Sequence, residues 1–251
     1  MDHEDWATPN ERVCEGVKPS DGLKCSRRAT DPNYPFCMTQ HDKRANYCDP
    51  QMFRQDGLRN QMLETLRKRD KNHDRYNPGR KTSTRASSDE VDHIGECQTA
   101  AMCCQFATFT NDEEKHDVVK FFSGNLVNES RNFLVTSAVT NQRKGQGTTH
   151  FQQDLMKFSL SQYGEPNSQA LDDIREASFN VPIVATYNDR LLEQGLSRAS
   201  TRAIRRESGQ ALQYWKYKCL DEGDSPIYDV LGKLVGKIFV VFDLHIDADL
   251  D

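Results

Sequence analysis

The chain has 251 residues, of which 36% are hydrophobic and 28% charged, and its formal net charge is −5. This length accommodates one large domain or two small ones, and no segment approaches the roughly 20 consecutive apolar residues that cross a bilayer. The acidic N-terminus, MDHEDW, lacks the basic and then apolar segments of a secretory signal. We therefore expect an intracellular protein, in the nucleus or the cytoplasm, with no membrane partner.

Four candidate metal ligands lie within residues 1–50. Cys14, Cys25, Cys37 and His41 follow the pattern C-x10-C-x11-C-x3-H, and intracellular thiols are metal ligands or packing residues more often than disulfides. The segment resembles small CCCH zinc-binding modules, whose ligands suit tetrahedral Zn²⁺. Because it has few apolar residues, we expect it to fold around a structural zinc ion. Cys48 is a substitute ligand, and unconnected thiols with a surface histidine are the competing interpretation.

Residues 51–89 are predicted to form a helix and then a basic linker. Apolar residues recur close to helical spacing from position 52 to 69. The segment Arg67–Arg85 carries eight lysines or arginines against two aspartates and contains a turn signal at Pro78-Gly79. We expect a solvated loop that contacts nucleic-acid phosphates, with a nuclear localisation patch or a plain linker as alternatives. The candidate phosphate contacts here are Arg80 and Lys81.

The rest of the chain predicts a mixed α+β class with helix in excess. Between residues 90 and 150 we expect, in chain order, a strand at Val91–Ile94, helices at 97–109 and 112–123, a strand at Phe133–Ser137, and a helix at 139–145 that stops near Gly145. Residues 151–251 are mainly helical, with predicted helices at 151–162, 168–177, 188–197 and 200–218 and one apolar strand at Gly236–Leu244. This last region is expected to act as a scaffold, a specificity region or a surface for a protein partner or a homo-oligomer.

Two short segments carry the most specific pattern. EVDHIGECQ, residues 90–98, contains adjacent Asp92 and His93, and RNFLVTSAVTNQRKGQ, residues 131–146, contains Asn132 and Asn141. Together they resemble the HNH (ββα-metal) endonuclease superfamily, most closely the HNH domain of RNA-guided CRISPR nucleases, over about 55 residues. The resemblance implies a helix-rich α+β domain with a ββα-metal core, preceded by the zinc module.

The resemblance also implies a reaction and a set of roles. The chain would hydrolyse phosphodiester bonds of nucleic acid, DNA rather than RNA, with His93 as general base. Asp92 and Asn141 would hold Mg²⁺ or Mn²⁺, which prefer oxygen ligands, and Asn132 would set the second strand and the surroundings of the base. The further phosphate contacts would be Arg143, Lys144 and His150.

Several features depart from this pattern. Between His93 and Asn132 lie 38 residues, so the two intervening helices would be an insertion packed outside the ββα unit, and Asn125 or Asn128 competes for the middle-asparagine role. Adjacent strand residues point to opposite faces, so Asp92 and His93 must lie where the strand ends, as Gly95 indicates. Flanking C-x-x-C zinc pairs are absent, and the cysteines of the first helix are expected to pack in the core: Cys97, Cys103 and Cys104.

The alternative function is a non-catalytic zinc-containing module that binds nucleic acid or protein, with a decayed or accidental HNH pattern. In that case Asp92 and His93 form a surface ion pair, Asn132 is a turn residue and Asn141 is a helix cap. A toxin or selfish-element effector is a third hypothesis that the sequence cannot establish.

Overall fold

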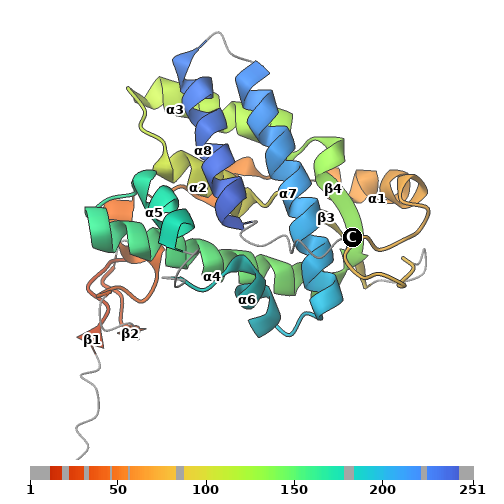
Figure 1. The fold of residues 1–251 in the computed structure, drawn as a ribbon, viewed down its shortest axis with the longest axis horizontal. Coiled ribbons are helices and arrows are strands. Elements are labelled where there is room, and N and C mark those ends of the chain that lie inside the picture. The colour runs from red at the N-terminus through yellow and green to blue at the C-terminus, as the bar shows by residue number, and fades with distance from the viewer. Residues whose placement is uncertain are drawn as a thin grey trace, which may run out of the picture.

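The structure is a computed structural model that describes residues 12–18, 23–30, 34–45, 47–55, 57–82, 88–177, 184–221 and 225–242. Helices dominate these residues, and two small antiparallel sheets accompany them (Figure 1). The predicted α+β class with helix in excess is confirmed in this form. No described helix is both long enough and apolar enough to pass through a bilayer.

A hairpin followed by a helix occupies one end of the molecule. Strand β3 (Asp89–His93) pairs antiparallel with β4 (Phe133–Ser137), with Val91 opposite Val135 and His93 opposite Phe133. Helix α4 (Ala138–Tyr163) starts directly after β4, and the Ser137 side chain caps it by accepting a hydrogen bond from the Thr140 backbone N–H. Both strands were predicted, and β4 has the predicted bounds.

Helix α4 is longer than the sequence predicts. The expected stop near Gly145 is wrong, because α4 continues through it for another 18 residues to Tyr163. A single helical glycine costs only about 1 kcal/mol, and the following turns bury apolar side chains such as Phe151 and Leu155. The segments predicted as helices at 139–145 and 151–162 are therefore one helix.

The insertion between the strands forms the centre of the helical body. It contains α2 (Cys97–Phe106), α3 (Asp112–Phe121), a π-helical turn (Phe122–Val127) and a 3-10 turn (Ser130–Asn132). Nearly all of α2 is buried, which confirms the predicted core packing of its three cysteines: Cys97, Cys103 and Cys104. The insertion lies outside the hairpin as expected, and α2 packs against α4 and α8.

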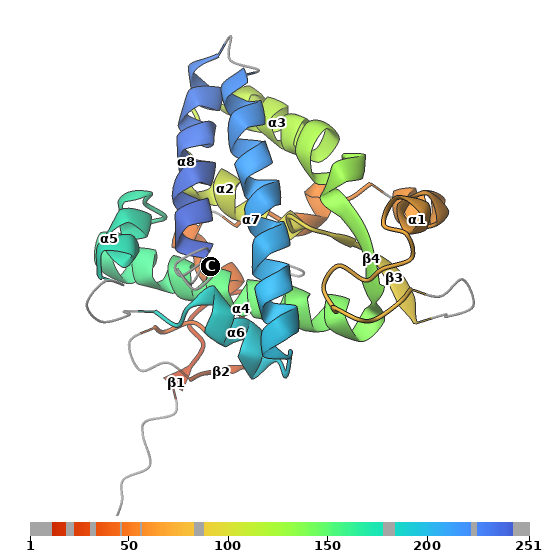
Figure 2. The same cartoon turned by 45° about the vertical axis from the view of Figure 1, so that its right-hand side comes forward.

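The C-terminal region is helical throughout its described part: α5 (Gln169–Ala177), α6 (Tyr187–Glu193), α7 (Arg198–Asp221) and α8 (Pro226–Phe242). Helices α7 and α8 lie side by side in both views (Figures 1 and 2). The predicted strand at Gly236–Leu244 is wrong, because α8 runs through its first seven residues and the last two lie outside the described part. The apolar run belongs to a helix rather than a strand, because α8 buries residues at helical spacing: Ile227, Leu231, Leu234, Val235, Ile238, Val241 and Phe242.

The N-terminal part is short of regular structure. It contains β1 (Arg12–Val13), β2 (Arg28–Ala29), 3-10 turns at Thr39–His41, Lys43–Ala45 and Pro50–Phe53, and helix α1 (Leu58–Arg69). Helix α1 begins later than predicted, after Gly57 with a left-handed φ of 75°. Its Leu66 packs with Val91, Phe133 and Val135, so α1 covers one face of the hairpin.

The basic loop after α1 is solvated only in part. Lys71 and Lys81 are exposed as expected, whereas Tyr76 is fully buried and Asp74 is 3% exposed. The Asp74 carboxylate accepts hydrogen bonds from the Tyr76 backbone N–H, Arg80 and the Thr136 hydroxyl. The expected solvated loop is therefore corrected at these buried positions, because one buried carboxylate organises them, and residues 83–87 lie outside the described part.

Helix α4 connects the N-terminal module to the hairpin. Lys144 reaches the hairpin, whereas the Lys157 ammonium lies 5.4 Å from the centre of the Tyr34 ring in the module. Lys157 lies thirteen positions after Lys144, which corresponds to about 20 Å along a helix. Figures 1 and 2 accordingly show β1–β2 and β3–β4 near different ends of α4.

Candidate metal centre and hairpin site

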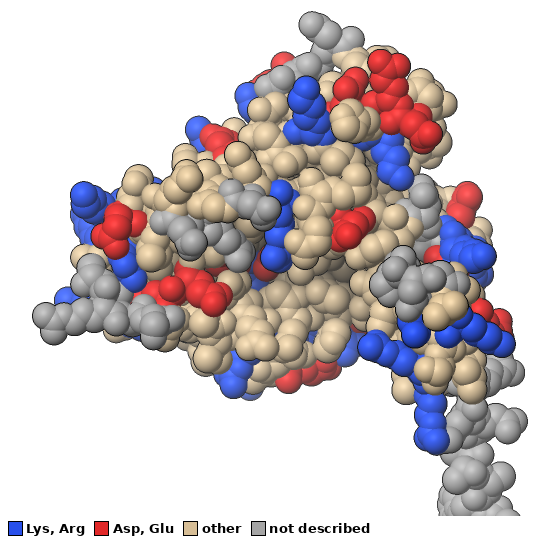
Figure 3. All heavy atoms as spheres, turned by 180° about the vertical axis from the view of Figure 1, so that it is seen from behind, with Lys and Arg blue, Asp and Glu red and all other residues tan. Residues whose placement is uncertain are grey.

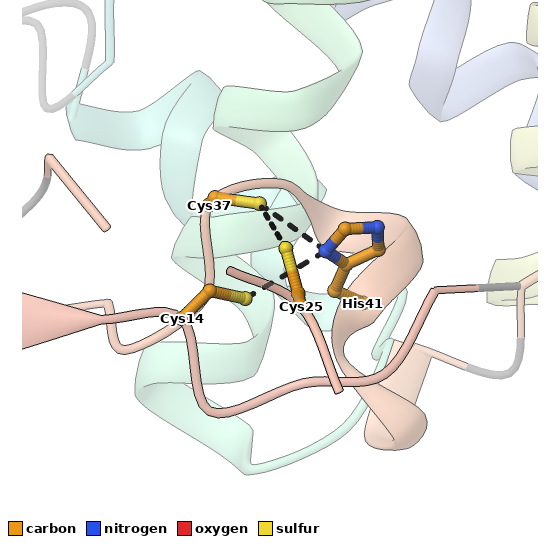
Figure 4. Close-up of side chains that lie close together, drawn as sticks. All are labelled: Cys14, Cys25, Cys37 and His41. Carbon is orange, nitrogen blue, oxygen red and sulfur yellow. Dashed lines mark hydrogen bonds between the residues drawn. The ribbon is translucent and has the colours of Figure 1, made fainter. Parts of the chain in front are cut away.

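The predicted zinc ligands come together in the structure. The ligand atoms of Cys14, Cys25, Cys37 and His41 all lie within 4.8 Å of one another (Figure 4). Cys25 Sγ is 3.6 Å from Cys37 Sγ, and His41 Nδ1 is 3.2 Å from Cys37 Sγ. A tetrahedral zinc ion with Zn–S bonds of about 2.3 Å has S–S edges of about 3.8 Å. The cluster therefore has the size and donor set of a site that can bind a metal such as zinc.

Backbone contacts bring the ligands together from separate segments. The Cys14 N–H donates to the Arg27 carbonyl, and the Cys25 N–H donates to the Gly16 carbonyl. A Cβ atom at Gly16 would lie 2.2 Å from the His41 carbonyl oxygen, so only glycine allows this approach. Cys48, the substitute ligand, is buried elsewhere and hydrogen bonds to Cys104.

The electrostatics of the cluster depend on burial and on hydrogen bonds. Burial lowers the pKa of His41 and so favours the neutral imidazole, which is the form that binds metal. Burial would raise the pKa of Cys25, but hydrogen bonds from the Arg27 N–H and from the thiols of Cys37 and Cys14 lower it. Burial and the hydrogen bond to Cys25 raise the pKa of Cys37 to about 12. The hydrogen bonds thus make the Cys25 thiol easier to deprotonate than the Cys37 thiol.

In the hairpin site, Asp92 forms a buried ion pair with α4. Lys144 Nζ donates to Asp92 Oδ2 at 2.8 Å, to Glu96 Oε1 at 2.8 Å and to the His93 carbonyl at 2.5 Å. Asp92 and Lys144 are both 0% exposed. Burial alone would lower the pKa of Lys144, but the carboxylates of Asp92 and Glu96 raise it well above its ordinary value. The ammonium is therefore held charged between three oxygen atoms.

His93 lies on the other side of the strand from this ion pair. Its ring is 4.6 Å from that of Phe133, and its Nε2 is 3.4 Å from Asn128 Oδ1. The Asn128 amide nitrogen donates to the carbonyls of Phe53 and Ser123, which directs its oxygen to His93. Neutral His93 then carries its proton on Nε2, and Nδ1 is the accepting nitrogen.

Asn132 joins the beginning of β4 to the end of β3. Its Oδ1 accepts a hydrogen bond from the Gly95 N–H at 2.7 Å, and its Nδ2 donates to the carbonyls of Gly95 and Val127. A Cβ atom at Gly95 would lie 2.5 Å from the Trp215 ring, so a side chain there is excluded. The strand therefore ends just after the Asp92–His93 pair, where the sequence places the break.

The remaining predicted residues occupy several places. Asn141 Nδ2 donates to Glu90 on β3, one helical turn before Lys144. Arg80 pairs with Asp74 and Asp89, whereas Lys81 is exposed. Besides Lys144, the predicted contacts of α4 lie against the segment that follows α6: Arg143 donates to the Gly195 carbonyl, and His150 is hydrogen bonded to Gln194. The structure thus brings Asp92, Glu96 and Lys144 together, and His93 with Asn128.

Two residues of this arrangement were not among the predicted site residues. Glu96 immediately precedes α2, and its spacing of one turn from His93 is the signal in the sequence that points to it. Asn128 was considered only as a rival to Asn132, and it binds the histidine ring instead. No spacing rule could have identified it, because the π-helical turn Phe122–Val127 sets its position.

Charged residues are unevenly distributed over the face drawn in Figure 3. Seen from behind, acidic residues gather over α3, and lysines and arginines gather over the N-terminal module and near α1 (Figure 3). The acidic group includes Asp112, Glu113 and Glu114.

No family model matches the chain, and no curated protein or solved structure matches it either.

Proposed function

We propose that the protein is a metal-dependent HNH-type endonuclease that acts on DNA, with a structural zinc ion in its N-terminal module. One observation carries this proposal: an antiparallel hairpin leads directly into α4, with Asp92-His93 where its first strand ends. The Asn132 clamp on Gly95 and the Asn128 contact to the His93 ring add support. Cys14, Cys25, Cys37 and His41 would hold the zinc ion.

Each residue then has a defined task. His93 Nδ1 takes the proton from the attacking water, and Asn128 keeps the ring in the required tautomer. Asn132 fixes the backbone that carries the histidine. Asp92 and Asn141 would hold Mg²⁺ or Mn²⁺, which supplies charge at the leaving oxygen and orients water.

The donor set fits such an ion in part. Asp92 Oδ1 is buried, and no described residue gives it a hydrogen bond. The Asn141 side-chain oxygen likewise accepts no hydrogen bond from a described residue, since its contact to Glu90 uses the amide nitrogen. Lys144 holds the other Asp92 oxygen. Cleavage therefore requires two movements. Lys144 moves away from Asp92, which would release its ammonium for a phosphate, and the His93 ring turns to the Asp92 side of β3, since the two side chains lie on opposite sides of the strand.

The same ion pair favours a second candidate, a non-catalytic zinc-containing module that binds nucleic acid. Lys144 supplies one positive charge within a cage of three oxygens, and His93 is 2% exposed. A decayed nuclease in which a lysine has replaced the metal would show this arrangement.

Cleavage assays distinguish the two candidates. Zinc-loaded protein is incubated with supercoiled plasmid, linear duplex, single-stranded DNA and RNA in metal-free buffer, and Mg²⁺ or Mn²⁺ is then added. Omitting a chelator during the reaction keeps the zinc module intact. The endonuclease cuts DNA only after metal addition, whereas the binding module shifts DNA without cutting it in either metal.

The variant series uses His93→Gln beside His93→Ala. His93 is packed against Phe133, so alanine leaves a cavity, and glutamine keeps a hydrogen-bonding side chain that cannot act as a base near neutral pH. Asn125→Ala, at an exposed position of the same insertion, is the matched control. A folded His93→Gln protein that cuts at the wild-type rate would remove the proposed mechanism.

A further inference from the structure

A cavity of about 290 Å³ lies where the hairpin, α1 and α7 meet. Its wall includes Ile94, which directly follows β3, and Asn132, which directly precedes β4. Ile94 follows His93 directly, and Phe133, whose ring contacts His93, follows Asn132. The cavity therefore adjoins the backbone that carries the proposed general base.

Arginines dominate the charged lining of the cavity. Three of them, Arg69, Arg75 and Arg131, line it together with one acidic residue, Glu207. Glu207 is buried and pairs with both Arg75 and Arg206. Arg69 donates to the carbonyls of Ser130 and Phe133 and pairs with Asp70. These contacts fix the guanidinium groups at the cavity wall, an arrangement that suits phosphate binding.

An aromatic surface completes the wall. The Arg131 guanidinium lies over the Tyr214 ring, 4.5 Å from its centroid, and the arginine is 64% exposed. Its Nε pairs with Glu129, and within the described part of the chain no residue accepts a hydrogen bond from its two terminal amino groups. Stacked arginine and tyrosine planes are the groups on which unpaired bases rest in proteins.

Two further residues complete the lining. Trp215 is 0% exposed, and its indole N–H is buried without a hydrogen-bond partner among the described residues. Gln210 adds a side-chain amide for a base edge.

From these observations we propose that the cavity binds one unpaired nucleotide of a DNA strand beside the cleavage site. The placement beside a cleavage site rests on the proposed nuclease function. Arg75 and Arg131 bind the phosphate, and the base stacks on the Arg131–Tyr214 surface. A volume near the lower end of the roughly 300–1,000 Å³ range of small-ligand sites accommodates one nucleotide and excludes a base pair. The substrate strand is therefore single-stranded or locally opened at this point.

Binding measurements without turnover test this site. Zinc-loaded full-length protein is titrated into a fluorescein-labelled 12-nucleotide single strand in buffer without Mg²⁺ or Mn²⁺, and anisotropy gives Kd. The variants are Arg131→Ala, Arg131→Gln and Tyr214→Ala, with Arg202→Ala, an exposed arginine of α7 outside the cavity, as the matched control. We expect Kd to rise about tenfold or more for the cavity variants and less than about twofold for the control.

Two competitors define the ligand. Thymidine 5′-monophosphate is expected to displace the strand from wild type and not from Tyr214→Ala, whereas inorganic phosphate is expected to be the weaker competitor. Equal Kd values for all variants, equal competition by inorganic phosphate, or a duplex bound as tightly with the same variant dependence would overturn the proposal.

The two proposals fail separately. Cleavage that needs His93 together with cavity variants of wild-type affinity leaves the nuclease standing and removes the nucleotide site. Binding that needs Arg131 and Tyr214 without any cleavage keeps a nucleotide site and removes its role beside a catalytic centre. Far-ultraviolet circular dichroism of each variant, with Arg131→Gln as the conservative case, identifies any loss of affinity that comes from misfolding.

Discussion

The N-terminal module and the hairpin site both surround a cation position with protein ligands, but they are stabilised differently. The module has two-residue strands and short 3-10 turns, and its four ligands meet with little apolar packing around them. The hairpin site is covered by α1 on one face and α4 on the other, and its cation is the protein's own Lys144. We therefore expect the first region to need a metal ion to fold, and the second to fold before any metal binds.

This difference predicts separate responses when each cation is removed. Loss of zinc should unfold the module and leave the helical body, because the two regions contact different ends of α4. Loss of the Lys144 ammonium should destabilise the whole body, since it removes the positive charge that two buried carboxylates share.

The largest effect is expected from Cys25→Ala. The variant should lose its stoichiometric zinc, and with it the roughly 10–16 kcal/mol of apparent binding free energy typical of structural zinc sites. Elemental analysis and limited proteolysis measure zinc content and order in the module. Cys48→Ala, at a buried cysteine outside the cluster, is the control and should keep its zinc. Global unfolding of zinc-depleted protein would show that the two regions are not independent.

Lys144→Met is expected to reduce the free energy of unfolding by about 3–5 kcal/mol, because Asp92 and Glu96 stay buried without a counter-charge. Urea unfolding followed by circular dichroism measures the change. Lys120→Met, at an exposed position of α3, should change stability by less than about 0.5 kcal/mol. Adding Asp92→Asn and Glu96→Gln to Lys144→Met should recover part of the loss, and no recovery would contradict the ion-pair account.

The same ion pair predicts a dependence on alkaline pH. The pKa of Lys144 is raised above the ordinary value of 10.5 in the folded protein, so the folded state retains a proton that the unfolded state releases. The stabilisation is therefore fully present below pH 10.5 and decreases as pH rises above it towards the folded pKa. Urea midpoints of wild type and Lys144→Met should converge above this pH. A constant difference would argue against a charged Lys144.

Asn132→Ala is expected to cost about 1–3 kcal/mol, because it leaves buried backbone groups of Gly95 and Val127 without hydrogen bonds. Thermal or urea unfolding measures this value beside Asn125→Ala, which should be nearly neutral. Equal stability of the two variants would mean that the Asn132 clamp does not hold the strand end.

The structure of the N-terminal module and that of the hairpin site could be predicted from the sequence to different extents. Ligand type and spacing were enough to predict which residues form the cysteine–histidine cluster, because metal coordination needs only four donors brought together. In the hairpin, short apolar and β-branched runs located β4 and most of β3. The Lys144 cage was not predicted, since it depends on which face of α4 meets Asp92. The apolar run in α8 was misassigned as a strand because periodicity does not distinguish a strand from a buried helix in a short segment.

The nucleotide cavity was also beyond the sequence. Its arginines and tyrosine come from positions 69 to 214, and only packing of α7 against the hairpin end brings them together. Trp215 is buried, whereas its neighbour Tyr214 is partly exposed at the cavity.

Asn141→Ala should have the smallest effect on folding, because its hydrogen bond to Glu90 is exposed and contributes less than about 0.5 kcal/mol. This property makes it the most direct test of the hairpin as a metal-dependent catalytic centre. Plasmid cleavage by zinc-loaded wild type and Asn141→Ala is measured over a series of Mg²⁺ concentrations. The account predicts metal-dependent cutting by wild type and a loss of about 100-fold or more in the equally stable variant. Equal cutting rates, or no cutting by wild type at any metal concentration, would contradict it.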